Sequence, residues 1–242
     1  MQFSAVIGQQ EIIHRLCDMA QHQRVPNTLM LCGPAGCGKM AVALAFASYL
    51  LGERNEGKPS GASSDHKAVS DDFIGEWKTM LSASPYFTLE SWLTAMGATN
   101  QQALIGAGES DVLAKKLLLK SSQGGYKVSI IWLPARMNVE CANKLLKLLE
   151  EPPHQTVFIL VCEEPELLLD TIKSRAQRMD MKRIDDSDMV TALMERRALL
   201  PEDAQRIARI ANGNWLKALE SLDVNSENVQ FLDMFKMLMR LA

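Results

Sequence analysis

The sequence lacks the features that mark a membrane-spanning, exported or generally nucleic-acid-binding protein. No apolar run within the 242 residues is long enough to cross a bilayer. The opening residues, MQFSAVIGQQ, contain no basic stretch followed by an apolar one, so they do not predict export. The net charge of -3 gives no general attraction to nucleic acid. These absences predict a cytoplasmic protein with no membrane partner.

Cysteines are also few. The five cysteines are widely spaced and form no CxxC pair, so neither a disulfide framework nor a zinc site is expected. Cys32 and Cys162 each end an apolar run, and we interpret them as small buried hydrophobic residues. This usage fits a reducing compartment, and the sequence predicts no metal site.

The apolar pattern predicts an α/β fold. Short apolar runs at 29–32, 127–133 and 156–162 are typical of buried strands, and helical patterns alternate with them. Strands of this kind between helices indicate a parallel sheet covered by helices on both faces. From residue 187 onward the pattern is purely helical, which predicts a small second domain made of helices.

The domain boundaries follow from changes in composition. We expect the α/β domain at 1–165, with a polar surface insertion rich in Gly, Ser and Pro at 52–72, and the helical domain at 166–225. The apolar helical pattern at 226–242 either packs on that domain or begins a third one. Most aromatic residues fall within 73–96, where too few basic residues are interleaved for base stacking, so packing helices are expected.

The strongest motif matches the pattern GxxxxGK and lies between a predicted strand and a predicted helix, as a phosphate-binding loop does. Its residues are Gly33, Pro34, Ala35, Gly36, Cys37, Gly38, Lys39 and Met40. The glycines let backbone N–H groups converge on phosphate oxygens, and Lys39 adds a positive charge at the helix N-terminus. The alternative is a glycine turn with a surface lysine, but the flanking strand and helix favour the phosphate loop.

This motif lacks the groups that hold Mg²⁺. Met40 stands where a complete loop has Ser or Thr, and a thioether is a poor ligand for a hard cation. The second predicted strand ends in Trp132 and Leu133, where active enzymes of this type carry acidic residues. The nearest acid, Glu140, is expected on the following helix. The sequence therefore predicts no metal-assisted hydrolysis at this loop, and ATP or ADP bound there weakly or not at all.

A third candidate, the pair Ser174 and Arg175, follows the third predicted strand. Taken alone, this stretch is interpreted as a solvated basic loop, the usual place of an arginine flanked by Lys173 and Arg178.

Several segments resemble one family, the bacterial DNA polymerase III clamp-loader subunits, which are AAA+ proteins. The stretches VIGQ at 6–9 and RVPN at 24–27 resemble the opening of that family. The stretch ANKLLKLLEEPP at 142–153 resembles its signature NALLKxLEEPP, and IKSR at 172–175 resembles its SRC motif, with Ala176 where the family has Cys. The similarity runs through residues 1–222.

The resemblance implies an AAA+ domain, then a helical lid domain, then only the start of a collar domain at 226–242. Within the family the chain resembles the delta-prime subunit rather than the motor subunit, gamma/tau. Alignment places the motor's acidic pair on Trp132 and Leu133, its sensor-2 arginine on Leu216 and its sensor-1 threonine near Cys162. Many relatives carry a four-cysteine zinc module after the phosphate-loop helix, and this chain has a cysteine-free insertion there, so no zinc is expected.

The resemblance also implies a role. In this family the arginine of the SRC motif reaches into the ATP site of the neighbouring subunit, so Arg175, with Ser174, is expected to be an arginine finger acting in trans. The implied partners are the gamma/tau and delta subunits, with the sliding clamp and primer-template DNA contacted through the complex. The expected protein is thus a non-hydrolysing component of a DNA polymerase holoenzyme. The alternative is an ATP-hydrolysing motor subunit, against which Met40, Trp132 and Leu133 argue.

Overall fold

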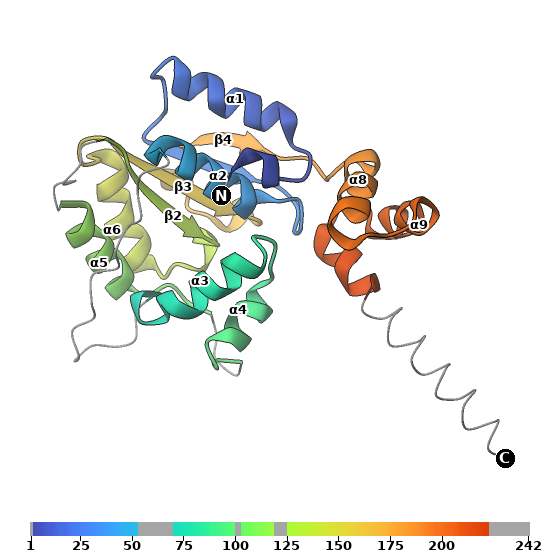
Figure 1. Ribbon diagram of the computed structural model, residues 1–242. Coiled ribbons are helices and arrows are strands. Elements are labelled where there is room, and N and C mark those ends of the chain that lie inside the picture. Colours follow the sequence, from blue (N-terminus) through green and yellow to red (C-terminus); the bar gives the residue numbers. More distant parts are fainter. Residues whose placement is uncertain (1, 53–69, 100–102, 119–124, 223–242) are drawn as a thin grey trace.

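The computed structural model describes residues 2–52, 70–99, 103–118 and 125–222 (Figure 1). Most of the insertion expected at 52–72, and all of the segment 226–242, lie outside the described residues. Along the described stretches, no helix combines the length and the apolar character needed to cross a bilayer.

A four-stranded parallel sheet forms the centre of the molecule. Its strands are β1 (Thr28–Cys32), β2 (Lys127–Trp132), β3 (Thr156–Cys162) and β4 (Gln177–Asp180). They lie in the order β2-β3-β1-β4, and each neighbouring pair is parallel. The expected α/β fold with a parallel sheet is confirmed.

Helices pack on both faces of this sheet (Figure 1). The helices of the α/β part are α1 (Gln10–Gln21), α2 (Lys39–Leu51), α3 (Ile74–Ala83), α4 (Leu89–Ala95), α5 (Ala107–Leu118), α6 (Val139–Glu150) and α7 (Asp170–Lys173). Short 3-10 turns lie at Phe3–Ala5, Ser70–Phe73, Pro134–Arg136 and Pro165–Leu167.

Alternation along the strands divides the core in two. Leu29 and Leu31 of β1 belong to the cluster formed with α1 and α2, whereas Met30 and Cys32 belong to the cluster formed with α5 and α6. Successive side chains of a strand point to opposite faces, so a strand covered on both sides needs apolar residues at every position. All five residues of β1 are buried, which explains the continuous apolar run seen in the sequence.

The fourth strand, β4, did not appear among the expected elements. Its sequence is Gln-Arg-Met-Asp, and only Met179 is buried. It pairs with β1 at the edge of the sheet, where one buried side chain and polar neighbours suffice. The strand falls inside the range 166–225, so the sheet continues past residue 165 before the helices of the second part begin.

The helical part consists of α8 (Asp186–Arg197), α9 (Pro201–Ala211) and a helix at 215–222. Met189, Leu193 and Ile207 are buried where these helices meet. The backbone N–H of Ile184 donates to the carbonyl of Gly213 at 3.1 Å, which ties the segment after β4 to the turn before the last helix. Between residues 186 and 222 the regular structure is helical, in agreement with the sequence pattern.

The aromatic stretch at 73–96 folds into α3 and α4, as expected. Trp77 lies 5.3 Å from Phe87 and 4.9 Å from Trp92, measured between ring centroids, and both Trp77 and Phe87 contact Trp132 at the end of β2. These rings are packed against one another, which supports the packing interpretation of this stretch over a base-stacking surface.

Candidate functional site

The loop between β1 and α2 has the backbone shape of a phosphate loop. Gly36 and Gly38 adopt φ angles of 71° and 95°, in the left-handed region that glycine accommodates best. Gly38 caps α2, which begins at Lys39. The sequence motif is therefore placed where it was predicted, at the N-terminal end of a helix after a buried strand.

The helical part of the chain presses against this loop. A Cβ atom added at Gly36 would overlap the side-chain oxygen of Asn214. That oxygen accepts a hydrogen bond from the N–H of Leu216 at 3.0 Å, and the N–H of Trp215 donates to the carbonyl of Gly36 at 3.1 Å. The start of the last helix is thus fastened to the phosphate loop.

The side chain of Lys39 is used within the chain itself. It is 4% exposed, and its Nζ donates to the carbonyl oxygens of Gly33 at 2.9 Å and Pro34 at 2.6 Å. The same Nζ forms an ion pair with Oε1 of Glu163 at 3.3 Å. A carboxylate from the end of β3 therefore neutralises the charge that would otherwise meet a phosphate.

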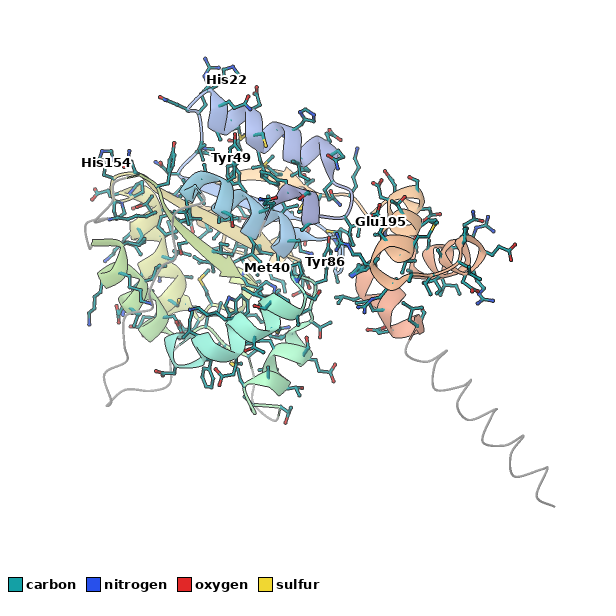
Figure 2. The ribbon with its side chains drawn as sticks, viewed as in Figure 1. His22, Met40, Tyr49, Tyr86, His154 and Glu195 are labelled. Carbon is teal, nitrogen blue, oxygen red and sulfur yellow. The ribbon has the colours of Figure 1, made fainter. Side chains whose placement is uncertain are left out.

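Little room remains over the loop. The cavity bounded by Gly36, Gly38 and Lys39 has a volume of about 30 Å³, and a hollow beside Pro34 and Ala35 measures about 190 Å³, whereas small-molecule sites usually measure ~300–1,000 Å³. Tyr86 and Met40, both labelled in Figure 2, line the smaller cavity together with Trp132, Glu163 and Leu216. The hydroxyl of Tyr86 accepts a hydrogen bond from a buried backbone N–H at 3.0 Å, and burial raises the pKa of this phenol. The site is filled by the protein's own side chains.

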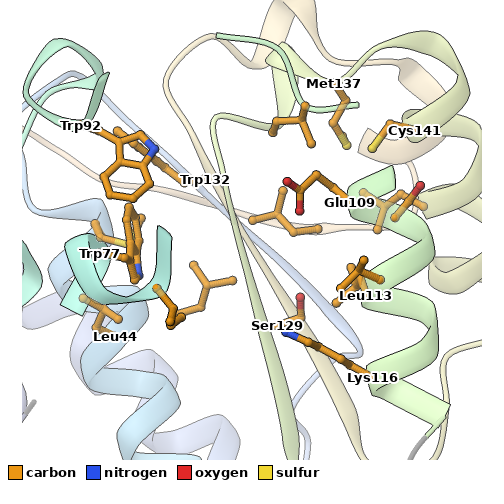
Figure 3. Close-up of a pocket in the computed structure, with 18 residues that line it drawn as sticks. Leu44, Trp77, Trp92, Glu109, Leu113, Lys116, Ser129, Trp132, Met137 and Cys141 are labelled. Atoms are coloured by element: carbon orange, nitrogen blue, oxygen red, sulfur yellow. The ribbon is translucent and has the colours of Figure 1, made fainter. Parts of the chain in front are cut away.

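A larger apolar cavity of about 390 Å³ lies beside β2 (Figure 3). Trp77 and Trp92 line one side of it, and Leu113 of α5 lies on the other. Met40 and Trp132 line both this cavity and the small one over the loop, so their side chains lie between the two. Of the residues predicted for the phosphate loop, only Met40 reaches this larger space.

The two residues expected to replace the acidic pair, Trp132 and Leu133, lie at the end of β2. Trp132 ends β2 with its ring in the aromatic cluster, and Leu133 follows in a left-handed turn with φ 52°. Glu140 lies in the first turn of α6, as predicted, and is paired with Lys144 at 3.2 Å. The described residues that end β2 are thus apolar.

The positions aligned with the motor's sensor-1 threonine and sensor-2 arginine are occupied by Cys162 and Leu216. Cys162 lies opposite Cys32 on the neighbouring strand, and both are 1% exposed. The hydrogen bond to Cys162, together with burial, raises the pKa of the Cys32 thiol well above its usual range. Leu216, at the position expected for an arginine, lines the small cavity. The described residues contain no group of three or more His, Cys, Asp or Glu side chains placed to hold a metal ion.

Arg175 lies at the opposite end of the sheet. It lines an open hollow of about 520 Å³ together with residues 26–28, which lead into β1, whereas the phosphate loop follows the end of β1 at Cys32. A strand of this length spans ~16 Å, so Arg175 is too distant to reach its own phosphate loop. The structure does not bring Arg175 and the loop into one site.

The guanidinium of Arg175 is already held by neighbours. Its Nη2 forms an ion pair with Oε1 of Glu150 at 2.7 Å. Its Nη1 donates to the carbonyl of Thr171 at 2.8 Å and approaches the Ser174 hydroxyl at 3.4 Å. The predicted pair Ser174 and Arg175 therefore forms a contact, and Glu150 joins it.

Two acidic residues that contact the predicted site residues, Glu163 and Glu150, were not predicted from the sequence. Glu163 lies directly after an apolar strand, which marks it as a residue at the carboxyl end of the sheet, and that position was the available signal. Glu150 is the last residue of α6, but its contact with Arg175 depends on how α6 packs near α7. No spacing rule along the chain predicts that contact.

Comparisons with known proteins agree with these features. The family model described as DNA polymerase III, delta subunit, matches residues 8–185. DNA polymerase III subunit delta′ of Pseudomonas aeruginosa is 34% identical over 170 residues, which cover 69% of this chain and 45% of that protein. DNA polymerase III subunit tau of Bacillus subtilis is 28% identical over 227 residues, covering 91% of this chain and 37% of that protein. The chain thus spans less than half the length of these relatives.

Among solved structures, the RuvB Holliday junction branch migration motor of Thermotoga maritima has a similar fold. The TM-score is 0.52 at 16% identity, over 88% of this chain and 60% of that one. This likeness concerns the fold alone, which is of the AAA+ type. Together with the family match over most of the chain, it leads to one identification: the chain belongs to the DNA polymerase III delta-subunit family and is a delta-prime-like member of the clamp-loader proteins.

Proposed function

We propose that this protein is a non-hydrolysing clamp-loader subunit that supplies Arg175, with Ser174, to the ATP site of a neighbouring motor subunit during sliding-clamp loading. The observation that carries the proposal is the separation of the two sites. Arg175 lies at the end of the sheet opposite the phosphate loop and lines an open hollow. An arginine in that place can meet a nucleotide only if another subunit presents it.

The closed state of the chain's own phosphate loop supports the non-hydrolysing part. Lys39 is bound to two backbone carbonyls and to Glu163, and the cavity of about 30 Å³ is too small for a nucleotide. Met40 carries a thioether where a hydroxyl would bind Mg²⁺, and Leu133 rather than a carboxylate follows Trp132. Within the described residues, these two positions therefore offer no side-chain oxygen to the cation. ATP or ADP is accordingly expected to bind there weakly or not at all.

The chemistry of an arginine finger suits the exposed side chain of Arg175. Phosphoryl transfer builds negative charge on the transferred group, and a guanidinium offers charged N–H donors in a planar array that matches phosphate oxygens. In well-studied cases such a finger accelerates hydrolysis by ~10³–10⁵. The chain would therefore regulate a reaction whose substrate is bound elsewhere.

The proposed partners follow from the family. They are the gamma/tau and delta subunits, with contacts to the sliding clamp and primer-template DNA made through the assembled complex. The proposed place of action is the cytoplasm. These assignments are proposed from relatives of which this chain spans less than half the length.

The test is the ATPase of a reconstituted complex of full-length subunits. Arg175→Ala should lower the clamp- and DNA-stimulated ATPase by removing hydrolysis at the one site that Arg175 serves, without preventing assembly. Arg178→Ala is the matched control, because Arg178 lies nearby on β4 and pairs with Asp180 at 2.8 Å. Unchanged ATPase in Arg175→Ala would remove the finger role. Turnover by the isolated chain that is lost in Lys39→Ala would contradict the non-hydrolysing role.

A further inference from the structure

We propose that Glu150 is a positioning residue for Arg175, an inference that rests on the finger role proposed above. The two side chains form an ion pair at 2.7 Å, between Oε1 of Glu150 and Nη2 of Arg175. Because a guanidinium is planar, this contact, together with those to the Thr171 carbonyl and the Ser174 hydroxyl, sets the direction in which the remaining N–H groups point.

Three acceptors contact the guanidinium. They are the Glu150 carboxylate, the Thr171 carbonyl at 2.8 Å and, more weakly, the Ser174 hydroxyl at 3.4 Å. A guanidinium carries five N–H donors. Within the described part of the chain, these contacts leave the Nε–H and one N–H of Nη2 for a further acceptor. The side chain is therefore oriented without being saturated.

The placement of Glu150 is fixed by secondary structure. It is the last residue of α6, and Pro152 and Pro153 follow in the sequence and prevent the helix from continuing. A carboxylate at the C-terminal end of a helix is disfavoured by the helix dipole. The ion pair with Arg175 offsets that cost and joins the end of α6 to the turn after α7.

The pair remains open to an incoming anion. Arg175 is 36% exposed and Glu150 46%, and both line the hollow of about 520 Å³. A phosphate group that approached this hollow would meet the remaining N–H donors of Arg175. It would also meet the negative charge of Glu150. Glu150 therefore has two opposing effects on the neighbour's nucleotide: it orients the guanidinium that binds the phosphates, and its own charge repels them.

These two effects separate kinetically. The repulsion acts on the phosphates in both the bound state and the transition state, so it changes KM more than kcat. Orientation of the guanidinium matters most in the transition state, where charge builds on the transferred phosphoryl group. If Glu150 positions Arg175, its loss lowers kcat. If Glu150 instead only holds Arg175 away from the nucleotide, its loss raises kcat.

The experiment measures kcat and KM for ATP in the reconstituted full-length complex, in which the motor site served by Arg175 is the only one left competent. Glu150→Ala should lower kcat by about tenfold to a hundredfold, the range associated with misplacing a catalytic group by about 1 Å, while KM falls or stays the same. Glu150→Gln keeps the shape and an acceptor oxygen, so it should recover much of kcat. Glu151→Ala is the matched control, because it removes the adjacent carboxylate without touching the contact to Arg175.

The possible results are distinguishable. If Arg175→Ala leaves kcat unchanged, the finger role fails and the inference falls with it. If Arg175→Ala lowers kcat but both Glu150→Ala and Glu150→Gln match the unmodified complex, only the positioning role is overturned. A rise in kcat in Glu150→Ala would also overturn it. In the Arg175→Ala background, Glu150→Ala should have no further effect on kcat.

Discussion

Removal of the Glu163 carboxylate should destabilise the protein through Lys39. Lys39 is 4% exposed and carries its charge beneath the phosphate loop, 3.3 Å from Glu163. In Glu163→Ala this buried charge keeps, among the described residues, the carbonyl oxygens of Gly33 and Pro34 as partners. The ammonium group would lose the one counter-charge that the described residues give it, while remaining largely shielded from water.

The size of the effect lies between two limits. Exposed ion pairs contribute ~0.2–1 kcal/mol, whereas breaking a fully buried pair costs ~3–5 kcal/mol. Glu163 is 38% exposed, which places the pair toward the lower limit, and the two carbonyls continue to solvate Lys39. We expect a loss of about 1–2 kcal/mol in the free energy of unfolding, or roughly 3–6 °C in Tm for a chain of this size.

Urea unfolding followed by tryptophan fluorescence measures this loss. Glu164→Ala is the control, because it removes the neighbouring carboxylate, which forms no ion pair with any described residue. High salt should reduce the difference between the two variants only slightly, since the buried end of the pair is poorly screened. A loss in Glu163→Ala no larger than that in Glu164→Ala would refute the assignment of Glu163 as the counter-charge.

Two further substitutions test the packing around the loop. Gly36→Ala should cost about 1–3 kcal/mol more in the free energy of unfolding than Gly97→Ala. Both glycines have φ near +70°, but of the two only Gly36 lies against Asn214. Equal losses would show that backbone strain alone is responsible. Tyr86→Phe should cost ~1–3 kcal/mol because it leaves a buried backbone N–H without an acceptor, whereas Tyr49→Phe, on a 44% exposed ring, should be nearly neutral. Thermal melts of the four variants compare these values. A neutral Tyr86→Phe would show that the hydrogen bond to the Tyr86 hydroxyl does not stabilise the fold.

Much of the fold could be predicted because its strands are covered on both faces. Continuous burial requires continuous apolar sequence, so β1 and β3 were located to within one residue. The edge strand β4 was not predicted because its residues are not continuously buried. It needs only Met179 inside, and one apolar residue among polar ones carries no pattern.

The candidate site was predictable in its motifs but not in its contacts. The phosphate loop has a fixed spacing because the chain must turn on glycines before a helix, so its residues could be named from sequence. The partners of that loop come from distant segments: Glu163 lies 124 residues beyond Lys39, and Asn214 lies 178 beyond Gly36. Such pairings depend on how β3 and the last helix pack, which no local pattern encodes.

The contacts between the two ends of the described chain bear on the order in which the protein completes its fold during synthesis. The amide of Gln9 donates to Lys182, the guanidinium of Arg196 to Ala5, and the N–H of Trp215 to Gly36. A ribosome releases the N-terminal segments first, and contacts of such large sequence separation form late. The loop after β1 therefore leaves the ribosome well before the residues that close it, so its closed shape can form only after the last helix has been made.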